Sequence, residues 1–505
     1  TFLRPDQSVP CVIPAQGESN HEIRILIKEY IPEKEKGVEE DIAQEIFLKL
    51  RGHNNLAFPN SRVDAENYAV LLSDKCDEAN VPNEFRVHHG SLSKVERESV
   101  EHELQQGQTP ITALCTSTLE LGVDIGKVKS IAQIGKANSV SGLRQRLGRS
   151  GRRNEPSILR VFSVEHQAES GTLYDLRANL VQNIAVIELL RIKQYEQPFV
   201  SKPHLSTLIQ QILSLIASYS GFYPKEGWEI LCNRGAFKSI QPSIFLQLLK
   251  SLGENDVISQ LNTGLIVIGK EGERLLRKPD FYTAFVSPID YTVINTYNSK
   301  RIGVLQYMPE VNHQIILAGR RWNVEKIDEK AKNIYVKRIS SGGKISFLSD
   351  GAEVDEIIAR KMKEIYMSDL SYPYVDVVTE SDKELLKARE YFFNNGLDKR
   401  SFTDGGLFTW AGIVINMTIS LMCKLVLQKD VPCDHIRITG ITRGDVNAIL
   451  SHQKPKPEDL ASMVGRHIKE KQKYDYLLSD ELLDYEYANT YLNVDKAWNE
   501  MLNLI

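Results

Sequence analysis

The first 165 residues alternate between two kinds of hydrophobic pattern. Residues 21–30 place Ile23, Ile25 and Ile27 at every second position, the spacing of a half-buried strand, whereas residues 38–50 have helical spacing. The same reasoning predicts further strands at 56–59, 85–88, 111–115, 130–134 and 159–163, and helices at 64–80 and 94–106. Strands separated by helices predict a parallel α/β sheet in this part of the chain.

The pattern becomes mainly helical after Phe162. Residues 173–195 predict one long amphipathic helix, and residues 204–252 predict further helices with a break near Gly221. Residues 258–268 predict a hairpin around an Asn-Thr-Gly turn. Helices followed by a small hairpin indicate a winged helix, and another kind of small helical domain is the alternative.

Short strands separated by turn residues fill the region 286–354 and predict a small antiparallel β-barrel or sandwich. Residues 355–365 are again helical. The remainder is mostly helical, with an exposed loop at 454–457. The short strands are expected at 291–295, 303–306, 314–318, 322–327, 334–339 and 345–348. Together these patterns predict a multidomain α/β protein.

Composition narrows the class of protein. A length of 505 residues suggests about three domains. Because the net charge of the whole chain is −4, any positively charged surface that binds nucleic acid must be confined to one part of the protein. No run of about 18 apolar residues and no signal peptide is found, which favours a cytoplasmic protein without a membrane partner. The six cysteines form no CxxC pair, so we expect buried thiols and no metal site.

An arginine-rich segment, 145–153, carries the strongest chemical signal. It reads Gln-Arg-Leu-Gly-Arg-Ser-Gly-Arg-Arg, and its three-residue spacing predicts that Arg146, Arg149 and Arg152 share one helical face. Arginine donates several hydrogen bonds to phosphate oxygens from a planar, permanently charged group. Such a face suits a polyphosphate, and a solvated basic helix is the alternative.

The segment resembles motif VI of superfamily 2 helicases, and other motifs of that family precede it in the usual order. Residues 56–62 resemble motif IV, and 88–93 with Arg97 resemble the next block. Residues 113–126 (Ala-Leu-Cys-Thr-Ser-Thr-Leu-Glu-Leu-Gly-Val-Asp-Ile-Gly) resemble motif V closely. The order and intervals together make the resemblance specific.

The resemblance implies roles for individual residues. Arg149 and Arg152 are expected to face the γ-phosphate of ATP and stabilise charge during phosphoryl transfer. Gln145 is expected near the nucleotide, with Gly122 permitting close approach and Asp124 reaching a ribose or ordering the arginines. The residues expected at the nucleic-acid backbone are Arg62, His89, Gly90, Thr116 and Ser117. Hydroxyls and main-chain N–H groups can hold phosphates there without reading bases.

The motifs that cradle ATP phosphates and Mg²⁺ are not found in their expected place. Residues 342–346 (Gly-Gly-Lys-Ile-Ser) lack the spacing of a phosphate loop, and 354–358 (Val-Asp-Glu-Ile-Ile) lie after motif VI. We therefore expect a first RecA-like lobe before Thr1, and read the chain, which does not begin with Met, as a fragment. ATP and Mg²⁺ would need that lobe, and the fragment alone is predicted to be inactive.

Later segments narrow the resemblance to Lhr-type helicases. Residues 317–328, which contain Gly-Arg-Arg-Trp, are similar to the Lhr β-domain signature, as are 334–337 and the region of Met362. The resemblance covers residues 1 to about 370. It implies a second RecA-like lobe (1–165), a linker helix (166–200), a winged helix (201–285) and a β-domain (286–370). The sequence pattern predicts a mostly helical C-terminal domain (371–505), which departs from the usual Lhr ending.

Trp322 and Arg320 could bind single-stranded nucleic acid, because a base can stack on an aromatic ring while arginine holds a phosphate. Core packing of Trp322 beside solvated arginines is an equally good interpretation.

The sequence thus predicts the C-terminal portion of an ATP-dependent DNA helicase, moving 3′ to 5′ on single-stranded or partly duplex DNA. Three alternatives stay open: an RNA helicase, a non-catalytic nucleic-acid-binding module, and a motor subunit of a defence or repair assembly whose C-terminal domain docks a protein partner.

Overall fold

The computed structural model describes most of the chain in two compact units. One unit is drawn from 17–196 and 289–403, and the other from 197–288 and 404–505. The described residues are 22–32, 37–120, 124–151, 155–165, 172–197, 202–283, 291–305, 309, 311–317, 320–328, 331–339, 354–378, 380–399, 401–403 and 406–504.

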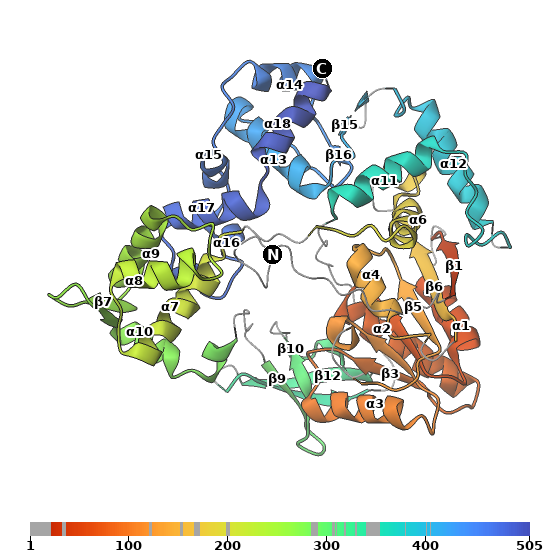
Figure 1. Ribbon diagram of the computed structural model, residues 1–505. Helices are drawn as coiled ribbons and strands as arrows, with labels where there is room; N and C mark the ends of the chain where they lie inside the picture. Colours follow the sequence, from red (N-terminus) through yellow and green to blue (C-terminus); the bar gives the residue numbers. More distant parts are fainter. Residues whose placement is uncertain are drawn as a thin grey trace. The chain divides into compact units, whose positions relative to one another are not determined.

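A six-stranded sheet forms the centre of the first unit (Figure 1). Its order is β1-β6-β5-β2-β4-β3, and every neighbouring pair is parallel, as the sequence predicted. The strands are β1 (Ile23–Tyr30), β2 (Asn55–Phe58), β3 (Phe85–His88), β4 (Thr112–Cys115), β5 (Ser130–Ile134) and β6 (Ser157–Val164). All residues of β2, β4 and β5 are buried, which explains why apolar residues predominate in these strands.

Helices connect these strands, and serine caps start those nearest the motifs. Ser61 accepts a hydrogen bond from the Asp64 N–H at 3.0 Å, and Ser93 accepts one from Glu96 at 3.2 Å. The helices thereby begin at the ends of the strands where the motif residues lie. They are α1 (Glu39–Leu50), α2 (Arg62–Glu78), α3 (Lys94–Gln106), the 3₁₀ turn η1 (Ser117–Leu119) and α4 (Val140–Leu147).

A five-stranded sheet packs on this lobe, and we call it the β-domain. Its order is β10-β9-β13-β12-β11, and β13 pairs with β9 in parallel while the other pairs are antiparallel. The sequence had suggested an antiparallel arrangement throughout. The strands are β9 (Tyr291–Asn295), β10 (Arg301–Leu305), β11 (Gln314–Leu317), β12 (Arg320–Asp328) and β13 (Asn333–Arg338). The strand expected at 345–348 lies outside the described residues.

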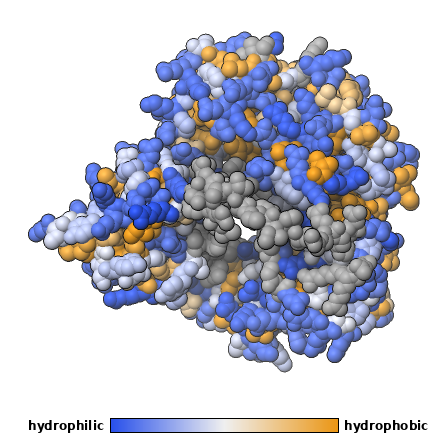
Figure 2. Space-filling model, viewed as in Figure 1, coloured by the Kyte–Doolittle hydropathy of each residue, from blue (hydrophilic) through white to orange (hydrophobic). Residues whose placement is uncertain are grey.

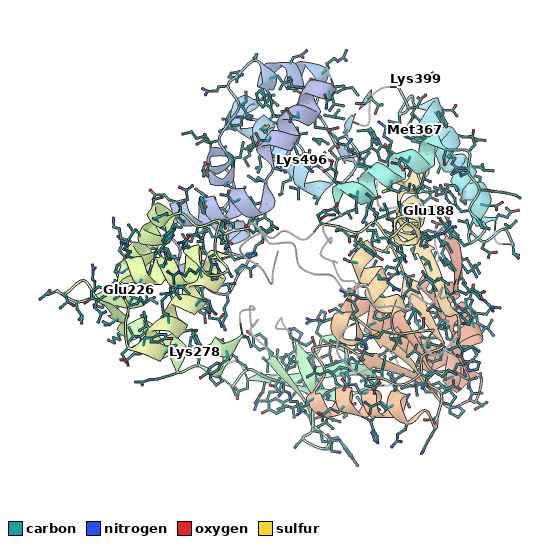
Figure 3. All side chains as sticks on the ribbon, in the orientation of Figure 1. Glu188, Glu226, Lys278, Met367, Lys399 and Lys496 are labelled. Carbon is teal, nitrogen blue, oxygen red and sulfur yellow. The ribbon has the colours of Figure 1, made fainter. Side chains whose placement is uncertain are left out.

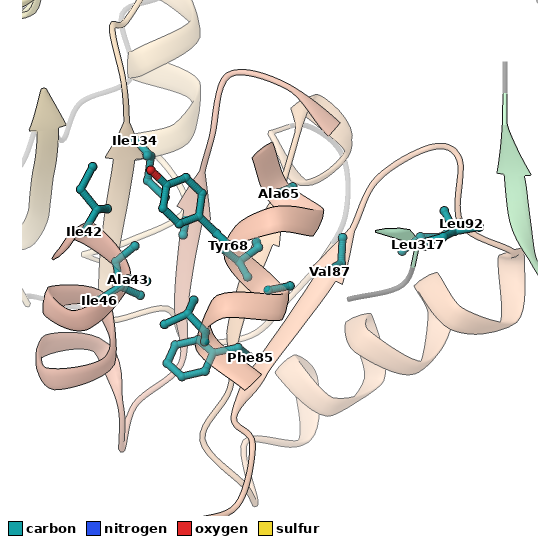
Figure 4. Packing of buried hydrophobic residues seen from close by; sticks show 14 of the residues in the cluster. Ile42, Ala43, Ile46, Ala65, Tyr68, Phe85, Val87, Leu92, Ile134 and Leu317 are labelled. Carbon is teal, nitrogen blue, oxygen red and sulfur yellow. The ribbon is translucent and has the colours of Figure 1, made fainter. Parts of the chain in front are cut away.

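One hydrophobic core is shared by the lobe and the β-domain. It runs from helices α1 and α2 through Leu92 to Leu317 and Trp322 of the β-domain (Figure 4). Main-chain hydrogen bonds reinforce it, since the Val304 N–H donates to the Ser91 oxygen at 2.6 Å. The two parts therefore form one rigid piece.

Further helices complete the first unit. They are α5 (Thr172–Asp175), α6 (Ala178–Arg191), α11 (Glu356–Met367) and α12 (Ser381–Asn394). The single helix predicted for 173–195 is divided at Arg177, which has φ +47°, and α6 is almost wholly buried because α11 packs on it. Glu188 of α6 and Met367 of α11 are labelled in Figure 3.

Residues 371–403 also belong to the first unit. The Ile27 N–H of β1 donates to the Tyr374 oxygen at 2.7 Å, and the Asp376 N–H donates to the Ile27 oxygen at 2.8 Å. The segment thus extends the edge of the parallel sheet, although the sequence pattern grouped it with the C-terminal helices.

The second unit is largely helical, as predicted for the C-terminal region. Its first part contains α7 (Leu205–Tyr219), α8 (Pro224–Trp228), a π-helix (Glu229–Asn233), α9 (Pro242–Glu254), the hairpin β7 (Ile258–Gln260) and β8 (Ile266–Ile268), α10 (Lys270–Leu276) and η3 (Pro279–Tyr282). Its last part contains β15 (Gly406–Phe408), α13 (Ile413–Leu427), β16 (Arg437–Ile438), α14 (Arg443–Leu450), α15 (Pro457–Ser462), α16 (Arg466–Lys469), η4 (Asp475–Leu477), α17 (Asp480–Tyr491) and α18 (Val494–Asn503). Both parts contribute to one core, where Leu482 and Leu483 join α7 and α9.

Hydrophilic residues cover most of the face in view in Figure 2. No helix of the described chain is long and apolar enough to cross a membrane.

Candidate nucleotide and nucleic-acid interface

The arginine-rich segment begins in helix α4 but leaves it early. The helix ends at Leu147, and Gly148 caps it. Gly151 has φ +72°, and a Cβ there would collide with Ser157. Arg146 thus lies within the helix and Arg149 lies in the turn after it, and the shared face expected for Arg146, Arg149 and Arg152 stays a prediction. Arg152 lies outside the described residues.

Arg149 is held against motif V. Its Nε and Nη2 both donate to the main-chain oxygen of Glu120, at 3.0 Å and 2.8 Å. The side chain is 9% exposed, so most of the guanidinium is withdrawn from solvent. Motifs V and VI are thus joined directly by a candidate phosphate ligand.

Arg146 is a second link between the motifs, and the sequence did not single it out from the other arginines. Its Nε and Nη2 each lie 2.8 Å from Glu120 Oε1, and Nη1 donates to Gln133. The guanidinium carbon lies 4.9 Å from the ring centroid of Phe58. Glu120 thus serves both arginines, one through its carboxylate and one through its carbonyl. The sequence feature that could have indicated this role of Glu120 was the presence of an acidic residue within motif V.

The other nucleotide candidates lie on the surface or outside the described residues. Gln145 and Asp124 are exposed. The Asp124 carboxylate accepts a hydrogen bond from the Gly126 N–H at 3.2 Å. Gly122 is outside the described part of the chain.

Four nucleic-acid candidates follow neighbouring strands. His88 of β3 lies opposite Cys115 of β4 in a parallel pair, so the residues after each strand meet at the same edge of the sheet. His89 and Gly90 follow β3, and Thr116 and Ser117 follow β4. The Thr116 N–H donates to the His88 oxygen at 3.4 Å. The structure therefore brings these four residues together, as the resemblance implied.

Arg62 reaches the same edge from the first position of α2. Its Nη1 donates to Ser91 Oγ at 2.9 Å, which places a guanidinium beside the loop after β3. Gly90 is exposed, and a Cβ there would meet no atom within 4 Å. The main chain is therefore open to a ligand at this point.

His89 is less accessible than the resemblance suggested. It is 1% exposed, and its Nε2 lies 2.9 Å from Oε1 of Glu66, which is itself buried. Its Nδ1 has no hydrogen-bond partner among the described residues. Glu66, which sequence reasoning missed, therefore fixes the orientation of the His89 ring.

His88 connects motif V to helix α3. Its Nδ1 lies 2.8 Å from Thr118 Oγ1, and its Nε2 lies 2.9 Å from Glu101 Oε1. Burial lowers the pKa of His88, which favours the neutral ring. The buried His88 ring thus connects Thr118 of motif V to Glu101 of α3 and has a structural role.

Trp322 is part of the core and does not present its ring to a base. It is 2% exposed, and its indole N–H donates to the Leu317 oxygen at 2.8 Å. The stacking role is therefore contradicted for Trp322, and the core interpretation holds. Arg320 is exposed and, with Arg338, lines a cavity of about 590 Å³ between α2, α3 and the β-domain.

Comparisons with known proteins agree with this geometry. The helicase conserved C-terminal domain family matches residues 38–154, which include the motifs described above. Lhr-Core from Saccharolobus solfataricus is 26% identical over 347 residues, covering 65% of this chain and 38% of that protein. Lhr-Core from Methanocaldococcus jannaschii is 29% identical over 198 residues, covering 39% of this chain and 21% of that protein.

The solved structure of Mycobacterium smegmatis Lhr bound to single-stranded DNA and AMP-PNP shares the fold, with a TM-score of 0.60 at 15% identity. The similarity covers 95% of this chain and 68% of that chain. The parallel sheet and its motifs thus define a helicase C-terminal domain. The chain is similar in sequence to the Lhr-Core helicases over up to 65% of its length. The chain matches between about one fifth and two fifths of the length of these two Lhr-Core relatives.

Proposed function

We propose that this chain supplies half of the motor of an ATP-dependent nucleic-acid helicase. ATP would bind between the parallel-sheet lobe and a first RecA-like lobe. Closure of the lobes would place Arg149 and Arg152 on the γ-phosphate, where they stabilise charge during phosphoryl transfer. The double hydrogen bond from Arg149 to Glu120 carries this proposal, because it connects the phosphate-facing motif to the motif that grips the strand.

ATP and Mg²⁺ impose different demands on the chain. Arginine geometry fits the anionic phosphates. Among the described residues, no group of three or more His, Cys, Asp or Glu could hold a metal ion. We propose that Mg²⁺ would be bound by ATP and by acidic residues of the first lobe, with Gln145, Gly122 and Asp124 of this chain contacting the nucleotide.

The loops after β3 and β4 would hold the nucleic-acid backbone. Arg62 offers a cation, Gly90 offers open main chain, and Thr116 and Ser117 offer hydroxyls. None of these groups selects a base, so the grip would be independent of sequence. We propose single-stranded DNA as the substrate, in line with the solved Lhr relative bound to single-stranded DNA. The proposed 3′-to-5′ movement is the direction that the resemblance to the helicase family implies.

We also propose that helices α7–α9 and the β7–β8 hairpin form a winged helix. The hairpin turns at Gly264, which has φ +85°, and the Leu261 N–H donates to the Leu265 oxygen at 2.9 Å. The five-stranded sheet would be the Lhr-type β-domain. The last helices would provide a surface for a protein partner.

The test is ATP hydrolysis by the complete gene product, with and without single-stranded DNA or RNA of the same sequence. We expect DNA to stimulate hydrolysis and this chain alone to show none. Stronger stimulation by RNA would identify an RNA motor. Nucleic-acid binding without any stimulated hydrolysis by the complete product would instead identify a binding module.

A further inference from the structure

The β9–β10 hairpin has an exposed aromatic residue at its tip. Tyr297 is 93% exposed, and its side chain makes no hydrogen bond or ring contact with the described residues. Lys300 and Arg301 follow it and are also exposed. Isolated exposed aromatics are common, so exposure alone does not define a site. Three further features distinguish this tip.

The first feature is a well-ordered turn. The Asn295 side chain accepts from the Tyr297 N–H at 3.0 Å, and the Asn298 side chain accepts from the Lys300 N–H at 3.1 Å. The Thr296 N–H donates to the Val336 oxygen of β13 at 2.9 Å. The turn therefore holds the tyrosine outward on a fixed support, so little conformational entropy is lost when a ligand binds.

The second feature is local charge. Residues 291–339 contain nine Lys and Arg against four Asp and Glu, although the whole chain carries −4. No acidic residue occurs between 291 and 309. The tip is therefore a positive site of the kind that attracts a polyanion.

The third feature is the root of the hairpin. Strand β10 is an edge strand, and its free edge pairs with the loop after β3: Leu92 bridges Gly303, and the Ser93 N–H donates to the Ile302 oxygen at 3.3 Å. This loop follows Gly90 in the proposed strand grip. Residues 300–302 separate this contact at Gly303 from the turn that carries Tyr297. At about 3.3 Å per residue, these three residues place the turn roughly 10 Å beyond the loop, which is about the length of three stacked nucleotides.

We propose that the β9–β10 hairpin tip is a second contact for the strand held at Gly90, where Tyr297 stacks on a base while Lys300 and Arg301 hold phosphates. The inference rests on the proposed function, since it requires nucleic acid at the loop after β3. An aromatic residue beside cations binds single strands without selecting a sequence. Single-stranded nucleic acid fits better than a duplex, because only unpaired bases expose a face for stacking.

Fluorescence anisotropy with a labelled oligothymidylate and this chain tests the proposal. We expect Tyr297→Ala to weaken binding about 5- to 100-fold without changing the salt dependence, because stacking releases no counterions. Lys300→Ala should weaken binding and reduce the slope of log K against log salt by about 0.7, the value for one phosphate contact on a single strand. Tyr297→Phe keeps the ring and should bind like the wild type.

A matched control is Tyr282→Ala, which removes a tyrosine that is 84% exposed and lies outside the hairpin. Its affinity should equal that of the wild type. Wild-type affinity in Tyr297→Ala would overturn the inference while leaving the proposed function intact. Failure of the wild-type chain to bind the oligonucleotide would overturn both.

Discussion

The guanidinium of Arg149 donates two hydrogen bonds to the main-chain oxygen of Glu120, at 3.0 Å from Nε and 2.8 Å from Nη2. Because the acceptor is a carbonyl, no side-chain substitution at 120 removes it. The link between motifs V and VI at this point thus depends on the residue at 149. Lysine could not reproduce it, because an ammonium lacks the planar pair of donors.

In the complete gene product, Arg149→Ala should lower kcat for ATP hydrolysis by about 10³-fold or more, the usual effect of losing an arginine that faces the γ-phosphate. Steady-state hydrolysis at saturating nucleic acid measures this. Arg144→Ala is the control, since Arg144 is an exposed arginine of the same helix and its side chain has no described partner. Equal losses in both variants would contradict a specific role for Arg149.

Replacing Trp322 should affect stability and not binding. Trp322→Phe loses ring volume and the hydrogen bond to Leu317, so we expect the free energy of unfolding to fall by about 1–3 kcal/mol. Denaturant unfolding followed by circular dichroism measures this fall, and oligonucleotide affinity should be unchanged. Weaker binding at unaltered stability would restore the stacking role.

Gly303 is required where the β-domain meets the loop after β3. A Cβ at 303 would lie 2.6 Å from the Ser91 oxygen, so Gly303→Ala must push β10 away. We expect a loss of about 1–3 kcal/mol and faster hydrogen exchange at the Ser93 and Val304 amides. Gly90→Ala is the control, because its Cβ would meet open space and the exchange at these amides should not change.

The acid Glu29 should make stability depend on pH. It is 8% exposed, so its carboxylate is largely withdrawn from solvent. Burial is the main cause that raises its pKa to about 8. Hydrogen bonding with Ser163 and the Arg177 cation oppose the shift, and the Glu384 carboxylate adds to it. Folding therefore favours the protonated form.

The unfolded chain releases this proton near pH 4.5, whereas the folded chain keeps it to about pH 8. The contribution of Glu29 to stability is thus full below pH 4.5 and declines as the pH rises to about 8. Glu29→Gln should remove this decline and stabilise the protein at pH 8.5 by roughly 2 kcal/mol. Melting temperatures of both proteins across this range measure the effect. Parallel pH profiles would contradict it.

The order of elements in the parallel sheet could be predicted from sequence because each strand and helix carries its own short-range pattern. The fully buried β2, β4 and β5 are short and mostly apolar segments, and helices α2 and α3 begin at serine caps. The motif residues at the ends of β3 and β4 followed from this order, since parallel strands end at one edge.

Features that depend on distant residues could not be predicted in this way. Leu92 and Leu317 share a core although 225 positions separate them, and each pattern alone suggested a separate domain. Trp322 was ambiguous for the same reason, because its surroundings come from the lobe. The end of α4 at Leu147, with Gly151 at φ +72° beyond it, also could not be predicted from the three-residue spacing of the arginines.

The shared core has a mechanical consequence. The β-domain and the parallel-sheet lobe are joined by apolar packing and by main-chain hydrogen bonds at residues 91–93, so they move as one rigid body. In the proposed ATP cycle, any rotation of the lobe would therefore move the tip of the β9–β10 hairpin by the same angle. A base stacked on Tyr297 and phosphates held at Gly90, the two proposed contacts, would therefore move together.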